Sequence, residues 1–205
     1  ELRTKEKKYT MVDTVTQRFA SIAVFFGFSA LVLTCVGVST PRWQSDFYAL
    51  ANGGYIKTGS ANFFYACLAY ANGSIYNCIQ RNEQLLGYST FSVADPWKTD
   101  YNQRMQNAGA LCIVGILFLF FGTLLTLIMA CVCFSTWITL LPPLCLFLAC
   151  LFMLAGMAEG SRYLLYNDYS ANLYQTGHLL SIFALFLSAF AAGRINFLRW
   201  SETND

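Results

Sequence analysis

Two cysteines on either side of a turn signal are the residues of this chain whose types and spacing most clearly predict chemistry. Cys67 and Cys78 flank Asn72-Gly73, a dipeptide that is typical of a two-residue β-hairpin turn. With Ala71 opposite Ser74 across that turn, counting outward along both strands places Cys67 opposite Cys78. Paired residues of an antiparallel ladder lie about 4.5–5.5 Å apart at Cα, which is within disulfide range. The pattern therefore predicts a hairpin closed by a Cys67–Cys78 disulfide.

The same turn carries a signal for N-linked glycosylation. Asn72-Gly73-Ser74 fits the acceptor pattern Asn-x-Ser. Glycans and disulfides are both added on the extracellular side of a membrane protein. The sequon at Asn72 and the cysteine pair therefore predict an extracellular segment.

Residues suited to catalysis or metal binding are few. His178 is the single histidine, and the nearest acidic residues along the chain are Asp168 and Glu159. No glycine-rich phosphate loop, metal-ligand cluster or Ser/His/Asp arrangement occurs in the sequence. We therefore expect no enzymatic activity, no metal and no cofactor, and we interpret His178 as a hydrogen-bonded histidine near the end of a helix.

The distribution of charge predicts the elements that must position these residues. Asp, Glu, Lys and Arg are absent from residues 19–41, 105–158 and 169–193. About 20 apolar residues cross the roughly 30 Å hydrocarbon core of a membrane, so the middle stretch is long enough for two crossings. Its Pro142-Pro143 suits the first turn of a new helix. We predict transmembrane helices at residues 19–39, 108–133, 140–158 and 174–196, with a turn at 134–139.

Composition excludes two other classes of protein. The chain is 56% hydrophobic and 12% charged, whereas soluble domains carry roughly 25% charged residues. The helices of a soluble four-helix bundle would also have polar faces, which these segments lack. The net charge of +2 is too small to indicate nucleic-acid binding. We therefore expect membrane lipids around the helices.

Basic residues place both ends of the chain in the cytosol. Lys and Arg cluster in the terminal segment 1–18 and recur around the terminal segment 197–205, and such residues collect on the cytosolic side of membrane proteins. With four spans, the long loop 40–107 and the short loop 159–173 then lie outside. Tryptophans follow just beyond span ends, as an aromatic belt requires; they are Trp43, Trp137 and Trp200. We expect a multi-pass protein of the plasma membrane.

The outer loop 40–107 is long enough to form a small domain. Besides the disulfide hairpin, residues 45–50 and 54–58 are expected to be strands, and Asp95-Pro96 is expected to end regular structure before the second span. The expected fold is a membrane all-α four-helix bundle with a small extracellular antiparallel β-sheet.

Two groups of residues each have two interpretations. Cys131 and Cys133, near the cytosolic end of the second span, are candidates for palmitoylation or for ordinary apolar packing. Small residues at close-packing spacing favour helix contacts, either within the bundle or with helices of a partner. They are Ala23, Gly27 and Ala30 in the first span, Gly115 and Gly122 in the second, and Ala184 and Ser188 in the fourth.

Taken together, these features resemble the claudin superfamily, which includes claudins, peripheral myelin protein, stargazin-type regulators of AMPA receptors, calcium-channel γ subunits and clarins. The residues that carry the resemblance are Trp43 after the first span, Phe64 in the aromatic run before Cys67, the second cysteine Cys78, and Arg104 before the second span. Asn167-Asp168-Tyr169-Ser170 is similar to the Asn-x-Tyr-Ser segment of stargazin and peripheral myelin protein. The family's Gly-Leu-Trp is replaced here by Asn62-Phe63-Phe64.

The resemblance implies a claudin-like fold and a function in binding other proteins. The leading hypothesis is an auxiliary subunit of an ion channel or receptor in the same membrane. The alternative is a claudin-like cell-adhesion or paracellular barrier protein that binds copies of itself. The loss of Gly-Leu-Trp and a first loop longer than in typical claudins favour the first. Loop aromatics are the candidate partner contacts, because aromatic residues anchor many interfaces; they are Phe63, Phe64, Tyr163 and Tyr166.

The predicted topology has a direct test. Asn72 should carry a glycan, so glycosidase treatment should lower the apparent mass of the protein. The same treatment should leave the apparent mass of the Asn72→Gln variant unchanged. An N-terminal epitope tag should bind antibody only after the cells are permeabilised. Staining of that tag on intact cells would invert the topology.

Overall fold

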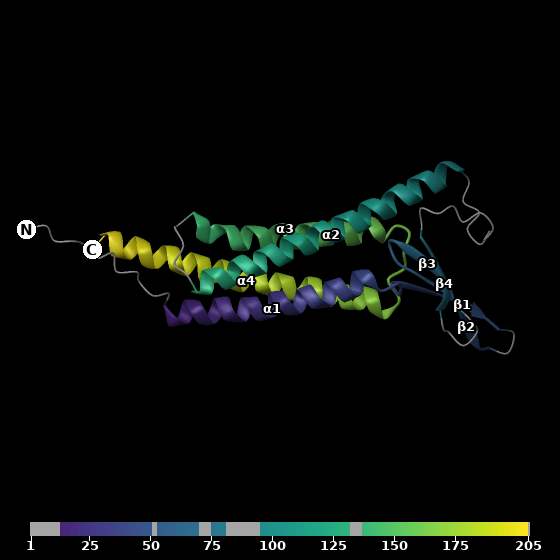
Figure 1. The fold of residues 1–205 in the computed structure, drawn as a ribbon, viewed down its shortest axis with the longest axis horizontal. Helices are drawn as coiled ribbons and strands as arrows, with labels where there is room; N and C mark the ends of the chain where they lie inside the picture. Colours follow the sequence, from purple (N-terminus) through teal and green to yellow (C-terminus); the bar gives the residue numbers. More distant parts are fainter. Residues whose placement is uncertain (1–12, 51–52, 70–74, 81–94, 132–136, 205) are drawn as a thin grey trace, which may run out of the picture.

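The computed structural model describes residues 13–50, 53–69, 75–80, 95–131 and 137–204, and it is a helical bundle with a small sheet at one end (Figure 1). The helices are α1 (Thr14–Ser39), α2 (Asp95–Cys131), α3 (Leu141–Gly160) and α4 (Tyr169–Asn204), with the short 3-10 helix η1 (Ile138–Leu140) before α3. The strands are β1 (Gln44–Ala49), β2 (Tyr55–Ala61), β3 (Tyr65–Ala69) and β4 (Ile75–Gln80). Helix α1 begins and α4 ends at the end of the bundle opposite the sheet (Figure 1).

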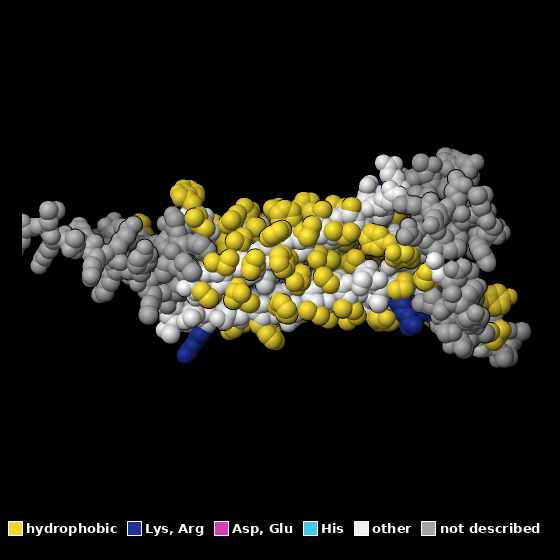
Figure 2. All heavy atoms as spheres, viewed as in Figure 1, with side chains coloured by type: hydrophobic (Ala, Val, Ile, Leu, Met, Phe, Trp, Pro, Cys, Tyr) yellow, Lys and Arg dark blue, Asp and Glu magenta, His cyan; other side chains and the backbone are white. Residues whose placement is uncertain are grey.

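Four of the described helical segments are long and apolar enough to cross a membrane; they are Thr14–Ser39, Gln103–Cys131, Ile138–Gly160 and Tyr169–Leu198. Large apolar side chains cover their outer surface. Phe25, Leu154 and Phe186 are 68%, 56% and 70% exposed, and Figure 2 shows hydrophobic side chains along the whole visible face of the bundle. A contiguous apolar surface of this extent is rare on a protein that folds in water. The bundle therefore has the surface of a membrane protein.

Three helices extend several residues beyond the predicted crossings. Helix α1 begins at Thr14 instead of 19. Helix α2 begins at Asp95 instead of 108, so residues 95–107 of the predicted outer loop are helical. The prediction that Asp95-Pro96 ends regular structure is wrong, because proline lacks only an N–H that the first turn of a helix leaves unbonded in any case. Helix α4 begins at Tyr169 instead of 174 and continues to Asn204.

Small residues allow the helices to pack closely within the bundle. Helix α1 packs against α2 and α4, and α3 packs against the same two helices. A Cβ atom on Gly27 of α1 would lie 2.5 Å from Thr123 Oγ1 of α2, and one on Gly115 of α2 would lie 2.7 Å from Met153 Cγ of α3. The other small residues singled out in the sequence are buried; they are Ala23, Ala30, Gly122, Ala184 and Ser188. These faces are therefore used inside the bundle, which decides between their two interpretations.

The sheet is antiparallel, with the strands in the order β1-β2-β3-β4. In the β3–β4 hairpin, Cys67 pairs with Cys78 and the two form a disulfide. This confirms the bridge and the predicted pairing of Cys67 with Cys78. The predicted register does not continue toward the turn, because it shifts between Leu68 and Ala69, and Ala69 pairs with Ile75 instead of Tyr76. Asn72 and the turn itself lie outside the described residues. The two further strands predicted at 45–50 and 54–58 correspond to β1 and β2.

The crossing of α1 and α4 near the sheet yields a stability prediction. A Cβ atom on Gly37 would lie 2.9 Å from Ser170 O, from Tyr174 Cβ and from Tyr174 N. Because two of these atoms are backbone, Gly37→Ala should cost about 1–3 kcal/mol through overpacking and lower the melting temperature of the purified protein. Gly193→Ala in α4 is the matched control, because nothing lies within 4 Å of a Cβ there. Equal melting temperatures for the two variants would contradict the close crossing.

Candidate functional site

Trp43 joins the sheet to the bundle. Its side chain is fully buried, and its indole N–H donates a hydrogen bond of 2.6 Å to the Gly37 carbonyl near the end of α1. Ring centroids of Phe63, Tyr174 and Tyr166 lie 4.4, 5.2 and 5.3 Å from the Trp43 ring. These rings come from the β2–β3 turn, from α4 and from the α3–α4 loop. Trp43, the first residue of the family resemblance, is therefore a structural anchor.

Asn62 shapes the turn between β2 and β3. Its Oδ1 accepts hydrogen bonds from the backbone N–H groups of Phe64 and Tyr65 at 2.8 and 2.7 Å. Its Nδ2 donates to the Thr40 carbonyl at 3.3 Å, beyond the end of α1. An Asn side chain that bonds to the backbone two residues on is a typical turn-forming contact. The Asn62-Phe63-Phe64 segment thus turns the chain and places Phe63 against Trp43.

The loop between α3 and α4, residues 161–168, lies along the edge of β1. The side-chain amide of Asn167 bonds to both backbone groups of Ser45: Oδ1 accepts from the Ser45 N–H at 2.9 Å and Nδ2 donates to the Ser45 carbonyl at 3.0 Å. The Asp168 N–H donates to the Trp43 carbonyl at 3.2 Å. Asn167 therefore takes the place of a neighbouring strand along the first half of β1.

Asp168 is the charged centre of this contact. Its carboxylate accepts hydrogen bonds from Ser45 Oγ and from the Tyr169 N–H, and it pairs with Lys57 Nζ of β2 at 3.1 Å. Burial by itself would raise the pKa of Asp168, but the hydrogen bonds from Ser45, Tyr169 and Lys57 and the charge of Lys57 outweigh it and lower that pKa. The residue also directly precedes α4, where the helix dipole favours a negative charge. The ionised carboxylate thus ties β1, β2 and α4 together.

Arg104 holds the sheet-side extension of α2. Its guanidinium pairs with Glu159 Oε1 at 2.8 Å, near the end of α3. Both side chains are about a quarter exposed, at 29% and 27%. The arginine of the family resemblance therefore has a partner within the bundle, in the described part of the chain.

The outer half of the β1–β2 hairpin carries exposed aromatic residues, which we call the aromatic tip: Phe47, Tyr48 and Tyr55. Their side chains are 59%, 65% and 75% exposed, and hydrophobic atoms protrude at the far end of the sheet in Figure 2. Phe47 pairs with Lys57, and Ala49 pairs with Tyr55. Because side chains alternate along a strand, Phe47 and Tyr55 lie on one face of the hairpin and Tyr48 on the other.

Sequence reasoning missed the aromatic tip, although a signal was present. The dipeptide Asn52-Gly53 stands between the two aromatic segments, as in a tight hairpin. Gly53 has a φ of +80°, a conformation that favours glycine, and the Leu50 N–H donates to the Gly54 carbonyl at 2.7 Å. That signal predicts a tight turn that joins the two aromatic segments as neighbouring strands.

The four loop aromatics named from sequence do not form an exposed patch. Phe63 is 2% exposed beneath the sheet, so its expected role as a surface contact is wrong: it packs against Trp43 instead. Phe64 and Tyr163 are half-buried and pack against the same core. Tyr166 is also half-buried, and its hydroxyl donates to the Met157 carbonyl at 2.6 Å. Burial raises the pKa of Tyr166, so the hydroxyl keeps the proton that it donates.

Among the described residues, no group of three or more His, Cys, Asp or Glu side chains is arranged to hold a metal ion. His178 is buried, and its Nε2 lies 3.1 Å from the Cys150 carbonyl. Cys131 is exposed at the end of α2, whereas Cys133 lies outside the described residues, so both interpretations of that pair stay open.

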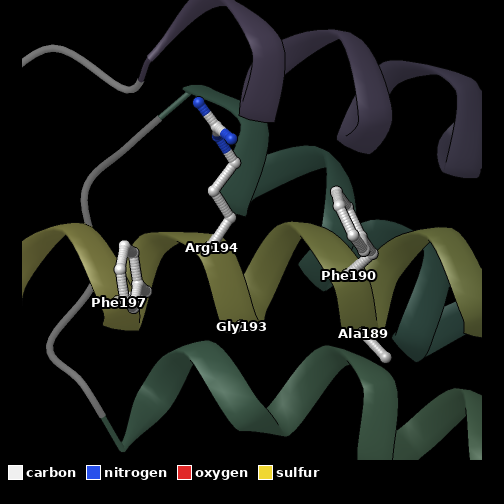
Figure 3. Close-up of a pocket in the computed structure, with 5 residues that line it drawn as sticks. All are labelled: Ala189, Phe190, Gly193, Arg194 and Phe197. Carbon is white, nitrogen blue, oxygen red and sulfur yellow. The ribbon is translucent and has the colours of Figure 1, made fainter.

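An open hollow of about 450 Å³ lies along α4 in the half of the bundle away from the sheet (Figure 3). Its lining residues all belong to α4; they are Ala189, Phe190, Gly193, Arg194 and Phe197. Arg194 forms an ion pair of 2.8 Å with Asp13 at the start of α1. Ligand pockets usually enclose most of their ligand, so this shallow surface lacks the form of a substrate site.

Comparison of the sequence with protein-family models and with curated proteins found no match. Inference about function therefore rests on the geometry of the sheet and the bundle.

The contact of Asp168 with the sheet yields a prediction with a pH dependence. Asp168→Asn removes the charge at nearly constant size, and it should cost about 1.5–3 kcal/mol, the range for a charged hydrogen bond. Because the fold lowers the pKa of Asp168, the stabilisation is complete above the usual carboxyl pKa of about 3.9 and is lost as the pH falls through the lowered value. Melting temperatures of the protein and the variant should differ at neutral pH and converge below about pH 4.

Hydrogen exchange separates this role from a general loss of stability. Amides of β1 should exchange faster in Asp168→Asn than in the unmodified protein. They should be unchanged in Glu159→Gln, because the Glu159 ion pair joins α2 to α3 and not to the sheet. Unchanged β1 exchange in Asp168→Asn would show that the loop does not hold the sheet.

Proposed function

We propose that the chain is a claudin-like, non-enzymatic membrane protein that acts as an auxiliary subunit of an ion channel or receptor. It spans the plasma membrane with both termini in the cytosol and the sheet outside. The observation that carries this proposal is the aromatic tip, on a sheet that Trp43 and Asp168 attach to the bundle.

The aromatic tip has the composition of a protein-binding surface. Phe47, Tyr48 and Tyr55 are each more than half exposed and lie on adjacent strands. Aromatic side chains bury a large area with few rotatable bonds, so they bind at low entropic cost and are frequent among the residues that dominate interfaces. A tip of this kind supports recognition of a protein more than recognition of a small molecule, for which an enclosed pocket is usual.

The packing of the bundle also supports the sheet as the surface that binds a partner. Its small-residue faces pack against its own helices, with Gly27 against Thr123 and Gly115 against Met153. Close backbone docking on the helices of another protein would need such faces. The sheet, which projects beyond the bundle (Figure 1), is therefore the part available to the outer domain of a neighbouring membrane protein.

The chain's charge distribution favours binding over transport. No Asp, Glu, Lys or Arg occurs in the apolar stretches 19–41, 105–158 and 169–193. Ionisable residues within the membrane usually mark the pathways of ions and protons. An auxiliary role, in which a partner conducts or signals, fits this pattern.

A second candidate function is claudin-like adhesion between cells. The outer half of β1 is exposed, and this strand leads away from the bundle. A copy in a facing membrane approaches from that side. This observation favours homophilic contact as the alternative.

Expression of the protein alone in cells that lack junctions separates the two functions. An auxiliary subunit gains its binding energy from a dissimilar partner, so it should stay diffuse over the surface of these cells. In cells that contain the partner, a channel or receptor should copurify in mild detergent. Strands at cell contacts together with altered paracellular ion flow would replace the auxiliary role with adhesion.

The surface that binds the partner is tested by substitution. The triple variant Phe47→Ser, Tyr48→Ser, Tyr55→Ser should reach the cell surface normally but recover at least tenfold less partner, about 1.4 kcal/mol or more. Leu165→Ser is the matched control, because Leu165 is 66% exposed on the α3–α4 loop outside the aromatic tip. Full recovery of the partner with the triple variant would exclude the tip as the contact surface.

A further inference from the structure

Strand β1 is an edge strand of the sheet, and the orientation of its backbone follows from the hairpin. The Leu50 N–H donates to the Gly54 carbonyl at 2.7 Å, so the backbone groups of Leu50 face β2. Successive residues of a strand alternate in direction, so the N–H and carbonyl groups of Ala49 and Phe47 face away from the sheet. Ser45, two residues further back, follows the same alternation, since its backbone groups bond to Asn167 outside the sheet.

Among the described residues, contacts cover only the first half of this edge. Asn167 bonds to Ser45, whereas no described residue forms a hydrogen bond to the outward backbone groups of Phe47 or Ala49. Both residues are exposed. Two N–H groups and two carbonyl groups in a row are thus open to another strand.

The open stretch also lacks the features that usually protect an edge strand. Proteins block such edges with charges, prolines or bulges in the strand itself, and Phe47 to Leu50 contain neither charge nor proline. The register shifts between Asp46 and Phe47 because β2 has one extra residue at that point. The residues of β1 therefore continue to alternate between facing β2 and facing away from the sheet. The nearest charges are engaged, because Asp46 accepts a hydrogen bond from Gln44 and Lys57 pairs with Asp168.

We propose that the outer half of β1 takes up an extended segment of the partner as an added antiparallel strand. The proposal rests on the auxiliary function above and states how the partner binds. Main-chain hydrogen bonds to Phe47 and Ala49 provide the pairing, and the aromatic tip packs against the side chains of the added strand.

The direction of β1 defines the segment that fits. The strand leads from the bundle, where Gln44 and Ser45 are buried, to the exposed tip (Figure 1). An antiparallel partner strand therefore runs toward the membrane, as does a segment that leads from an outer domain into a transmembrane helix. A second copy in the same membrane presents a β1 that also runs outward, and it cannot supply such a strand through β1.

The neighbouring side chains define the chemistry of that segment. Asn167 ends the open edge at Ser45, so the added strand pairs over about three residues. Among the described residues, the charged side chains nearest to it are Asp46 and Lys57, which are hydrogen-bonded or paired, and its neighbours on β1 are Phe47, Tyr48 and Ala49. An uncharged segment rich in β-branched or aromatic residues fits this surface.

A substitution that removes only a backbone donor tests the pairing. Ala49→Pro deletes an outward N–H and keeps all three rings of the tip, and proline is tolerated at such positions of an edge strand. Recovery of the partner channel or receptor should fall about tenfold in Ala49→Pro and stay unchanged in Ala49→Val. If Ala49→Pro binds as well as Ala49→Val while the triple tip variant does not, the added strand is wrong and the proposed function stands.

A photo-crosslinker identifies the occupant even if the proline disturbs the hairpin. Benzophenone-alanine in place of Tyr48 should join the protein to an extracellular segment of the partner directly before a transmembrane helix. A crosslink to any other part of the partner, or none in a complex that forms normally, overturns the added strand. A crosslink between two copies on adjoining cells overturns both the proposed partner segment and the auxiliary role.

Discussion

The attachment of the sheet to the bundle depends on the burial of Trp43. Its indole N–H reaches the Gly37 carbonyl at 2.6 Å, and its ring is covered by Phe63, Tyr166 and Tyr174. One side chain thus links α1, the β2–β3 turn, the α3–α4 loop and α4. Replacing a buried tryptophan by alanine typically costs about 3–5 kcal/mol, which is a large share of the stability of a small domain.

Polar contacts around this anchor set the orientation of the sheet. Asn167 completes the edge of β1 at Ser45, and the Asp168 carboxylate holds Ser45 and Lys57 together. Both residues sit just before α4, so the helix fixes their position. The base of the β1–β2 hairpin is therefore held in place, while its outer half is exposed and no described residue bonds to its outward backbone groups. Because the hairpin is held at its base, its exposed outer half can bind another protein without much loss of conformational entropy.

Much of the architecture could be predicted because it follows from local patterns. Long runs without charge define the membrane-crossing helices, and the Asn72-Gly73 signal correctly predicted that Cys67 pairs with Cys78, although the register shifts between Leu68 and Ala69. Each depends on residues that are close in the sequence. The prediction that the four loop aromatics are surface contacts failed because their positions depend on residues that are distant in the sequence. Whether Phe63 points outward or packs on Trp43 depends on the turn formed by Asn62 and on a loop about a hundred residues away. The periodicity of the sequence carries no information about such distant contacts.

The β1 edge likewise depends on contacts between distant parts of the chain. Its inner half is covered because Asn167 lies beside Ser45 in the folded chain, whereas no described residue bonds to the outward backbone groups of its outer half. In the sequence, Asp168 stood out as one of the two acidic residues nearest to His178 and as part of the segment similar to Asn-x-Tyr-Ser, and neither feature indicates a contact with the sheet. Its ion pair with Lys57 depends on the position of β2 beside β1, which brings Lys57 close to the residue that precedes α4.

The central claim is that the hairpin is held in one fixed orientation on the bundle, and a distance measurement tests it most directly. Spin labels carried by unnatural amino acids at Tyr55, on the aromatic tip, and at Ser161, after α3, can be measured by double electron–electron resonance in lipid nanodiscs. A single narrow distance distribution is expected, and Asp168→Asn should broaden it. A broad distribution in the unmodified protein would contradict the claim, because the sheet would then move freely relative to the helices.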